Sequence, residues 1–166
     1  MEYSNFPKIY REEPSVLQVN LGYKCNQSCS HCHVNASPFR TEMMSDETIS
    51  CIPKAIAMYG FDVLDITGGA PEMHRGFKDL VIEATKLNVE IIDRSNLTIL
   101  KEPGYEGLID FLALNKVKIV ASLPCYLESN VDSQRGKGVF VKSIDALKEL
   151  NNVGYGKKNS NLRIEI

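Results

Sequence analysis

Residues 16 to 32 read VLQVNLGYKCNQSCSHC, an apolar strand pattern that runs directly into three closely spaced cysteines. The apolar pattern from Val16 to Leu21 predicts a short β-strand. Cys25, Cys29 and Cys32 follow it, separated by three and then by two residues. One loop at the end of a predicted strand therefore supplies three thiol groups.

Three cysteines at this spacing are typical of a metal centre. An iron-sulfur cube takes one ligand per iron, normally a cysteine thiolate, so three cysteines leave one iron free for a ligand from outside the protein. The alternative is a structural zinc site in which His31 or His33 joins the cysteines. Both histidines flank Cys32, and adjacent residues seldom reach one ion without strain. The spacing leaves both centres open, and the residues after the loop favour the iron-sulfur cube.

Composition bounds the possible classes of protein. A chain of 166 residues with an ordinary apolar content is long enough for one domain with a single buried core. The formal net charge of −2, with acidic and basic residues interspersed, gives no electrostatic footprint for nucleic acid or for an anionic membrane. No apolar run approaches the length of a membrane-spanning helix. We therefore expect a small-molecule substrate, no nucleic acid and no membrane.

Cysteine usage and the N-terminal composition indicate the compartment. Residues 1 to 15 are polar, with Glu12, Glu13 and two prolines, and they lack the apolar core of a signal peptide. The count of five cysteines is odd, so the thiols are expected to be reduced rather than paired in disulfides. We predict a cytoplasmic, oxygen-sensitive protein.

Apolar periodicity predicts strands and helices that alternate along the rest of the chain. Further strands are expected over residues 62–67, 89–93, 117–122 and 162–166. Helices are expected between them, first from the N-cap Ser45 to Tyr59 with a kink at Pro53, and then around residues 77–87, 105–112 and 140–150. Because short loops join these elements, we predict an α/β fold with a parallel sheet.

Glycine-rich or polar segments follow the next three predicted strands. These segments are Gly68-Gly69-Ala70-Pro71, Arg94-Ser95-Asn96 and Ser122-Leu123-Pro124-Cys125. The carboxyl ends of parallel strands meet at one edge of a sheet, where ligands bind. We therefore expect these segments to converge with the cysteine loop on one site. A glycine pair is also compatible with a plain turn, although it lets the backbone approach a ligand closely.

These motifs resemble those of the radical S-adenosylmethionine (SAM) enzymes over nearly the whole chain. In that superfamily the cluster loop reads C-x3-C-x2-C, commonly with an aromatic residue where His31 stands here. Residues 66–72 are similar to the Gly-Gly-Glu-Pro turn that binds the methionine part of SAM, with Ala70 where glutamate is usual. Residues 121–124 and 135–140 are similar to the Ser-Leu-Asp and Arg-Gly-x-x-Gly-x-Phe segments of many members.

The resemblance implies a partial (β/α) barrel of parallel strands, a radical SAM half-barrel truncated after about five strands. It also implies two cofactors, a 4Fe-4S cluster bound by Cys25, Cys29 and Cys32, and SAM, whose amino and carboxylate groups bind the free iron. An electron from the cluster then splits the sulfonium C–S bond to give a 5'-deoxyadenosyl radical. The residues expected to bind SAM are Gly68, Gly69, Ala70, Pro71, Arg94, Asn96, Ser122 and Arg135.

Several of these residues have a specific expected role. The resemblance implies Ser122 near the SAM ribose and Arg135 near the SAM carboxylate or a partner acid. The carbonyl groups of the glycine turn can accept hydrogen bonds from the methionine ammonium. The basic turn 135–138 leads into a predicted helix whose N-terminus favours anions, or it is a solvated loop. Glu72 either orients the glycine turn or lies at the surface.

Three strings look most like the arsenosugar-biosynthesis group of the superfamily, which is associated with joining a 5'-deoxyadenosyl group to an arsenic substrate. They are TGGAPE at 67–72, DRSNLT at 93–98 and SLPCY at 122–126. Cys125 would then bind or orient a thiophilic substrate such as trivalent arsenic, or it is a small buried residue in a tight turn. Cys51 is expected to be a packing residue. The implied electron donor is a flavodoxin- or ferredoxin-like protein.

Members of that group are longer than this chain, which ends at Ile166 inside a predicted strand. We therefore expect residues 1–166 to be a single radical SAM core domain that is incomplete at its C-terminus. The alternative to an enzyme is a truncated or split half-barrel, non-catalytic alone, that binds a cluster or zinc and is completed by a second chain. The last strand should leave an open edge, and part of an apolar sheet face should stay uncovered.

Overall fold

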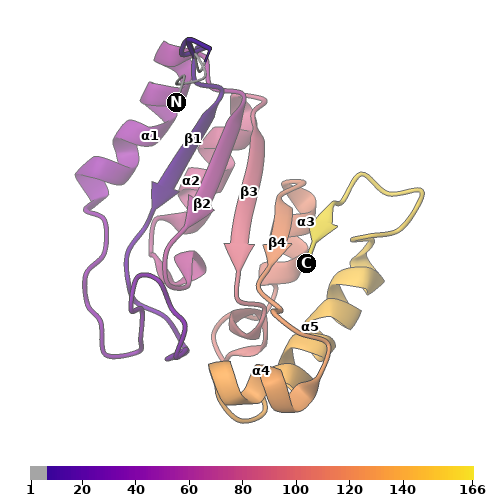
Figure 1. Ribbon diagram of the computed structural model, residues 1–166. Coiled ribbons are helices and arrows are strands. Elements are labelled where there is room, and N and C mark those ends of the chain that lie inside the picture. The colour runs from indigo at the N-terminus through magenta and orange to yellow at the C-terminus, as the bar shows by residue number, and fades with distance from the viewer. Residues whose placement is uncertain (1–6) are drawn as a thin grey trace.

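Five strands pair in sequence order, and every neighbouring pair is parallel. The computed structural model in Figure 1 describes residues 7–166. Residues 1–6, part of the segment that lacks a signal-peptide pattern, lie outside the described residues. The predicted α/β fold with a parallel sheet is confirmed. The strands are β1 (Val16–Asn20), β2 (Val63–Thr67), β3 (Glu90–Ser95), β4 (Lys118–Ala121) and β5 (Ile164–Glu165).

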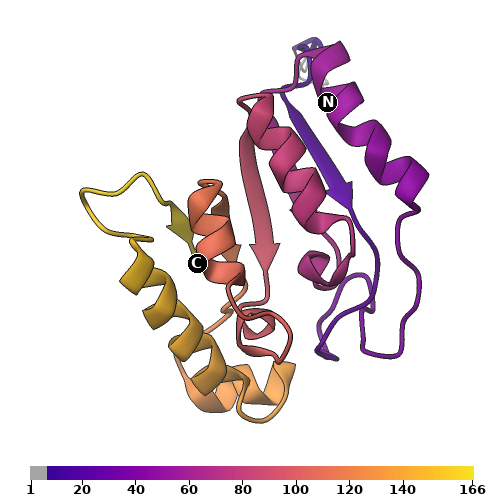
Figure 2. The same ribbon diagram turned by 180° about the vertical axis from the view of Figure 1, so that it is seen from behind.

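Helices cover one face of the sheet, as the opposite views in Figure 1 and Figure 2 show. The core lies between the two layers, because the apolar stripes of the helices pack on buried strand residues. In α2 the predicted stripe of Phe77, Leu80, Val81 and Ala84 is buried. The helices are α1 (Asp46–Tyr59), α2 (Phe77–Lys86), α3 (Leu108–Leu114), α4 (Glu128–Arg135) and α5 (Val139–Val153), with two 3-10 helices, η1 (Pro71–Met73) and η2 (Thr98–Lys101).

The two ends of α1 follow from its capping residues. The hydroxyl oxygen of Ser45 accepts a hydrogen bond from the backbone N–H of Thr48 at 3.1 Å, which confirms the predicted N-cap. Gly60 ends the helix in the left-handed conformation, with φ of 69°. The helix runs on through Pro53. Within residues 7–166, every helix is too short or too polar to span a lipid bilayer.

Three features of the fold differ from the predicted elements. β3 extends to Ser95, so Arg94 lies within the strand rather than after it. The short helices η1 and η2 and the helix α4 have no counterpart among the predicted helices. In α4 only Val131 and Arg135 are buried, so no apolar stripe marks this helix in the sequence. Arg135 consequently ends a helix, and the basic turn begins after it.

The face of the sheet opposite the helices is charged, whereas the sequence suggested an uncovered apolar face. Asp65 in β2 accepts hydrogen bonds from Gln18 of β1 and, through both carboxylate oxygens, from Arg94 of β3. A second set of ion pairs joins Glu90, Lys118 and Glu165 across β3, β4 and β5. Successive side chains of a strand point to opposite faces, so the open face alternates charged with partly buried apolar residues and is mixed rather than apolar. The fully buried apolar strand residues face the helices, whereas Val63, Ile92 and Val120 lie among the charged side chains of the open face.

The glycine pair after β2 packs against the backbone of the segment after β1. The N–H of Gly69 donates to the carbonyl of Gly22, and the N–H of Ala70 donates to the carbonyl of Lys24, both at 2.9 Å. A Cβ atom at position 69 would lie 2.4 Å from the carbonyl oxygen of Lys24. Backbone atoms cannot move aside as a flexible side chain can, so this close approach requires glycine.

We expect the Gly69→Ala substitution to destabilise the fold by about 2–3 kcal/mol, because its methyl group overlaps the Lys24 carbonyl. Gly60→Ala is the control, since its Cβ would meet no atom within 4 Å and only the left-handed backbone costs about 1 kcal/mol. Urea unfolding of the parent chain and both variants measures the two effects. An unchanged midpoint for Gly69→Ala would contradict the packing described here.

Candidate functional site

The segments predicted to converge meet at one cavity of about 280 Å³ beyond the carboxyl ends of the strands. Figure 1 shows the arrowheads of β1, β2 and β3 pointing toward the end of the sheet that carries the cysteine loop. Two predicted residues, Ala70 and Pro71, are buried and do not line the cavity. The predicted residues that line it are Cys25, Cys29, Cys32, Gly68, Gly69, Arg94, Asn96, Ser122 and Arg135.

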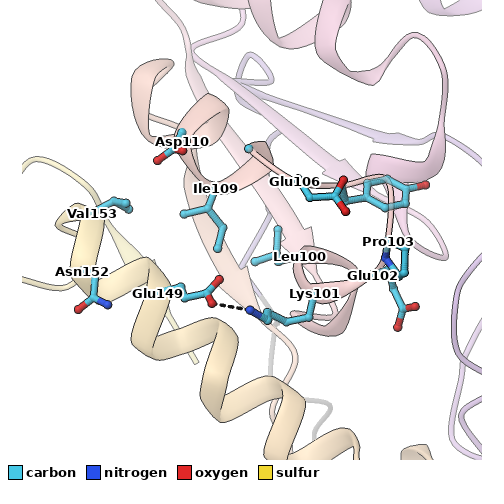
Figure 3. A pocket seen from close by; sticks show the side chains of 12 residues that line it. Leu100, Lys101, Glu102, Pro103, Glu106, Ile109, Asp110, Glu149, Asn152 and Val153 are labelled. Carbon is cyan, nitrogen blue, oxygen red and sulfur yellow. Dashed lines mark hydrogen bonds and ion pairs between the residues drawn. The ribbon is translucent and has the colours of Figure 1, made fainter.

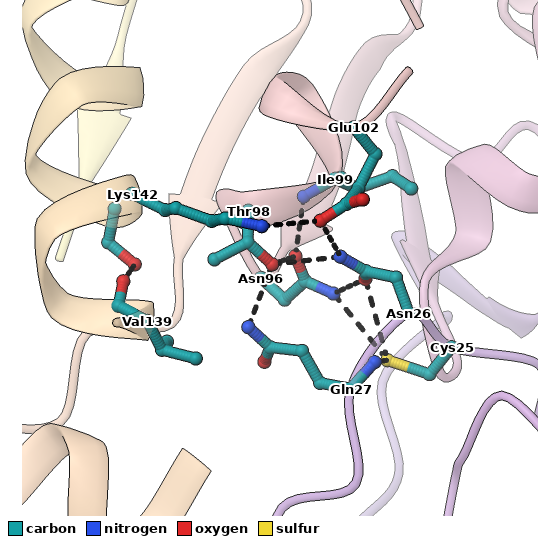
Figure 4. Close-up of polar contacts among 10 residues, drawn as sticks. Cys25, Asn26, Gln27, Asn96, Thr98, Ile99, Glu102, Val139 and Lys142 are labelled. Atoms are coloured by element: carbon teal, nitrogen blue, oxygen red, sulfur yellow. Dashed lines mark hydrogen bonds and ion pairs between the residues drawn. The ribbon is translucent and has the colours of Figure 1, made fainter. Parts of the chain in front are cut away.

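A hydrogen-bond network fixes the start of the cysteine loop to the end of β3 (Figure 4). The side-chain amide of Asn96 donates to Asn26 Oδ1 at 2.7 Å, and its oxygen accepts from Thr98 Oγ1 at 3.1 Å. The side chains of Asn26 and Gln27 donate to Thr98 Oγ1 at 2.9 and 2.7 Å. The position of the loop therefore depends on polar side chains from a distant part of the sequence.

Each cysteine sulfur has a polar neighbour. Cys25 Sγ accepts from the Gln27 N–H at 3.4 Å and from Asn96 Nδ2 at 3.5 Å. Cys32 Sγ accepts from a backbone N–H of the same loop at 3.3 Å, and the Cys29 thiol donates to Gln27 Oε1 at 3.5 Å. Burial outweighs the two hydrogen bonds that lower the pKa of Cys25, so this pKa lies above its ordinary value. Donors aimed at sulfur stabilise the thiolate, which is the form that binds metals.

All three thiols of the cysteine loop line the same cavity. In residues 7–166 no three His, Cys, Asp or Glu side chains are arranged to hold a single ion, although His31 and His33 also line the cavity. A structural zinc ion needs four donors within about 2.0–2.3 Å. In an iron-sulfur cube each thiolate binds its own iron, so the sulfurs stay apart. Three thiols on one cavity wall therefore fit a cube that takes one thiolate per iron and keeps one iron free.

Arg135 is a buried cation in the cavity wall, with 5% of its surface exposed. Its guanidinium donates to Gln27 Oε1 at 2.9 Å, to the backbone carbonyl of Asn96 at 3.1 Å and to the backbone carbonyl of Ser122. It forms no ion pair with a carboxylate of the described residues. Burying an unpaired charge is costly, so this site favours an anionic ligand.

The glycine turn offers acceptors, whereas Arg94 is already engaged. The carbonyls of Gly68 and Gly69 accept no hydrogen bond from residues 7–166. Arg94 donates twice to Asp65 at 2.8 Å. Burial raises the pKa of Asp65, but its hydrogen bonds from Arg94 and Gln18 outweigh this and hold the pKa below its ordinary value. Arg94 thus contributes to the cavity wall as half of an ion pair.

The two remaining cysteines lie outside the cavity lining. Cys125 is half-buried in the loop between β4 and α4, where its sulfur accepts from the Leu127 N–H and from Asn130 Nδ2, both at 3.4 Å. The Leu127 N–H, followed by the Asn130 amide, lowers the pKa of this thiol. Cys51 was expected to pack but is exposed, because it stands two positions after the buried Ile49 and so faces away from the core.

Gln27 and Thr98 are functional candidates that the motifs did not identify. Gln27 stands between two of the cysteines and contacts Cys29, Thr98 and Arg135. The position of Gln27, a polar residue between two of the cysteines, could have identified it from the sequence. Thr98 carries no such signal, because its contacts with Asn26 and Gln27 join segments that are far apart in the sequence.

A second cavity, of about 450 Å³, lies between η2, the start of α3 and the end of α5 (Figure 3). Lys101 and Glu149, which line it, form an ion pair with each other. None of the predicted cysteine or SAM-binding residues lines this cavity. It is a separate surface feature.

The chain is similar in sequence to proteins of one known superfamily. The profile of the Radical SAM superfamily matches residues 19–163. The chain is 30% identical over 139 residues to the sporulation killing factor maturation protein SkfB of Bacillus subtilis, covering 82% of this chain and 33% of SkfB. It is 24% identical over 139 residues to a probable GTP 3',8-cyclase of Saccharolobus solfataricus, covering 83% of this chain and 44% of the cyclase. The chain thus spans less than half the length of these relatives.

Solved structures share the fold. SuiB of Streptococcus suis bound to S-adenosylmethionine has a TM-score of 0.70 at 18% identity, covering 89% of this chain and 35% of SuiB. The enzyme anSMEcpe with bound AdoMet and a peptide has a TM-score of 0.68 at 17% identity, covering 90% of this chain and 41% of that one. With the match over residues 19–163, these findings show that the chain belongs to the radical SAM superfamily, whose members use a 4Fe-4S cluster and SAM.

Proposed function

We propose that this chain is the cluster- and SAM-binding part of a radical SAM enzyme, with Cys25, Cys29 and Cys32 as the ligands of the 4Fe-4S cluster. The observation that carries the proposal is the composition of one cavity wall. It combines three thiols, two glycine carbonyls and a buried guanidinium, and within residues 7–166 the carbonyls have no donor and the guanidinium has no carboxylate partner. Three thiolates and one cation match a cluster that keeps one iron free for SAM.

When bound, the cluster supplies the electron that cleaves the sulfonium C–S bond of SAM and yields the 5'-deoxyadenosyl radical. The protein's own contribution is to bind and orient SAM. The carbonyls of Gly68 and Gly69 accept from the methionine ammonium, and Ser122 lies on the ribose side. Ala70 and Pro71 act from behind the cavity by fixing the turn, because neither lines it.

Arg135 has two roles in this proposal. Its positive charge compensates the anionic cluster with its three thiolates, and its planar donor group holds Gln27, Asn96 and Ser122 in one arrangement. A lysine has one compact donor group and cannot reproduce this fork. Asn96, whose amide is engaged with Cys25 and Asn26, positions the loop rather than contacting SAM.

For the substrate we propose a trivalent arsenic compound that accepts the 5'-deoxyadenosyl group, as in the arsenosugar-biosynthesis group. The support is the set of three sequence strings at 67–72, 93–98 and 122–126. Cys125 is the thiol proposed to hold the arsenic, since its lowered pKa favours the thiolate that a soft ion prefers. A flavodoxin- or ferredoxin-like protein is the proposed electron donor.

One alternative is a half-barrel that binds the cluster but is inactive alone. The observation behind it is that β1 and β5 are the outer strands of an open sheet, so a second chain could pair with either edge. The two functions differ in one result. The enzyme releases 5'-deoxyadenosine from SAM by itself on reduction, and the half-barrel does so only after a partner is added.

Alanine substitution of Cys25, Cys29 or Cys32 should abolish retention of the cluster after anaerobic reconstitution with iron and sulfide, because each thiolate binds a different iron. Cys51→Ala is the matched control, since this exposed thiol lies outside the cavity, and it should retain the parent's iron content. Iron and sulfide content and visible absorption measure the effect. A colourless parent chain that holds stoichiometric zinc would rule out the cluster.

Arg135→Lys should increase the rate at which a chelator removes iron from the reconstituted chain by about 10-fold or more, as loss of an outer-shell partner does. Lys137→Ala removes an exposed charge two residues away and should leave the rate unchanged. Chelator-trapped iron followed by absorbance gives both rates. Equal rates for Arg135→Lys and the parent would show that the guanidinium does not support the cluster loop.

Alkylation of Cys125 by iodoacetamide should persist to lower pH than that of an ordinary thiol, because its lowered pKa keeps the thiolate populated as the pH falls. Asn130→Ala removes one of the two donors and should move the profile back toward higher pH. Peptide mass spectrometry of the cluster-loaded chain quantifies the modified fraction. Superimposable profiles for the parent and Asn130→Ala would contradict the assignment.

A further inference from the structure

Two carboxyl groups are buried together directly behind the glycine turn. Glu72 belongs to η1 and is 6% exposed, and Asp93 belongs to β3 and is fully buried. Ser95 lies on the same buried face of β3 as Asp93 and donates to Glu72, and the charge of Glu72 raises the pKa of Asp93, so the two carboxyl groups are close together. Neither lines the cavity proposed to bind SAM, so the function proposed above gives them no role.

Most of the carboxyl oxygen atoms of this pair have no hydrogen-bond donor in the part of the chain that the structure describes. The hydroxyl of Ser95 donates to Glu72 Oε1 at 2.6 Å. In residues 7–166, Glu72 Oε2 and both oxygens of Asp93 have no hydrogen-bond partner. Neither carboxyl forms an ion pair with a described Lys, Arg or His. The pair therefore has one neutral donor for four oxygens.

The titratable groups around the pair do not supply the missing donor. The Tyr155 hydroxyl donates to the backbone carbonyl of Val117 at 2.8 Å. Burial raises the pKa of Tyr155, and the charge of Asp93 raises it further. Burial raises the pKa values of Tyr105 and Cys25, and the charge of Glu72 adds to both increases. All three of these groups are neutral or anionic, so none of them compensates a carboxylate.

Two adjacent carboxylates without a cation cannot both stay ionised in a buried site. A carboxylic acid, unlike a carboxylate, can donate a hydrogen bond to its neighbour. We propose that Glu72 and Asp93 share a proton, and that this proton fastens η1, and with it the glycine turn, to β3. The pair is a positioning device: one residue follows the turn at 68–70, and the other lies in the strand that leads to Asn96.

The direction of titration agrees with this arrangement. Burial raises the pKa of Glu72 to about 7, and burial followed by the charge of Glu72 raises that of Asp93 well above its ordinary value. The unfolded chain releases both protons near pH 4, while the folded chain keeps them to higher pH. Stability from this pair is therefore fully present at acidic pH and is lost as the pH rises through neutrality.

The role of the turn in holding SAM rests on the function proposed above, whereas the shared proton does not. The experiment is accordingly done without SAM, on the cluster-loaded chain and on Asp93→Asn and Glu72→Gln. Each amide is close in shape to the acid that it replaces and supplies a permanent N–H donor to the remaining carboxylate. Either variant alone can test the proposal if the other does not fold.

Infrared spectra of the parent should contain the carbonyl band of a buried carboxylic acid at neutral pH, and both variants should lack it. The parent's melting temperature should fall by roughly 5 °C or more between about pH 6 and about pH 9, and that of Asp93→Asn should fall less. Hydrogen exchange of the peptide 66–76, corrected for the chemical rate, should accelerate about tenfold over this range in the parent only.

Asp65→Asn is the matched control on the opposite face of the sheet. Asp65 is paired with Arg94, so its amide variant should be less stable than the parent at neutral pH. Asp93→Asn should instead be more stable than the parent at this pH. Absence of the acid band in the parent, or a melting profile of Asp93→Asn parallel to that of the parent, would overturn the shared proton. A band that is present while exchange of 66–76 stays independent of pH would overturn the fastening of the turn.

Discussion

The buried guanidinium of Arg135 is the contact on which the candidate site depends. It donates at once to the cysteine loop, to the end of β3 and to the end of β4, through Gln27, Asn96 and Ser122. The three segments are distant in sequence, and only the ends of β3 and β4 are also joined by strand pairing. A planar group with several fixed donors can hold all three in one geometry. Without it, the side chain of Gln27 in the cysteine loop would lose its link to the ends of β3 and β4 through the guanidinium.

The glycine turn closes the opposite side of the same loop through backbone contacts. Gly69 and Ala70 donate to the carbonyls of Gly22 and Lys24, and position 69 leaves no room for a Cβ atom. Polar side chains therefore hold the cysteine loop on one side, and a close backbone approach holds it on the other. The cavity has its shape from the protein's own contacts, and this preorganisation lowers the cost of ordering the loop when a ligand binds.

The parts of the fold that follow from the periodicity of apolar residues could be predicted from the sequence. Strand and helix periodicity predicted the parallel sheet. The rule that ligands bind beyond the carboxyl ends of parallel strands predicted one shared site, and nine of the predicted residues line one cavity there. Features set by single polar contacts were missed. α4 has no apolar stripe, and Thr98 acts through partners far away in the chain. In β3 the buried positions are Ile91, Asp93 and Ser95, and an acid at such a position looks like an exposed residue in the sequence.

The polar ladder on the open side of the sheet constrains what can be placed against it. Covering Asp65, Arg94 and their neighbours with a dry hydrocarbon surface would strip water from charges that are already only just balanced by one another. A covering layer must therefore bring hydrogen-bonding groups of its own or leave room for solvent. Two copies of this face would therefore have little tendency to associate, because the charged groups of each would lose water.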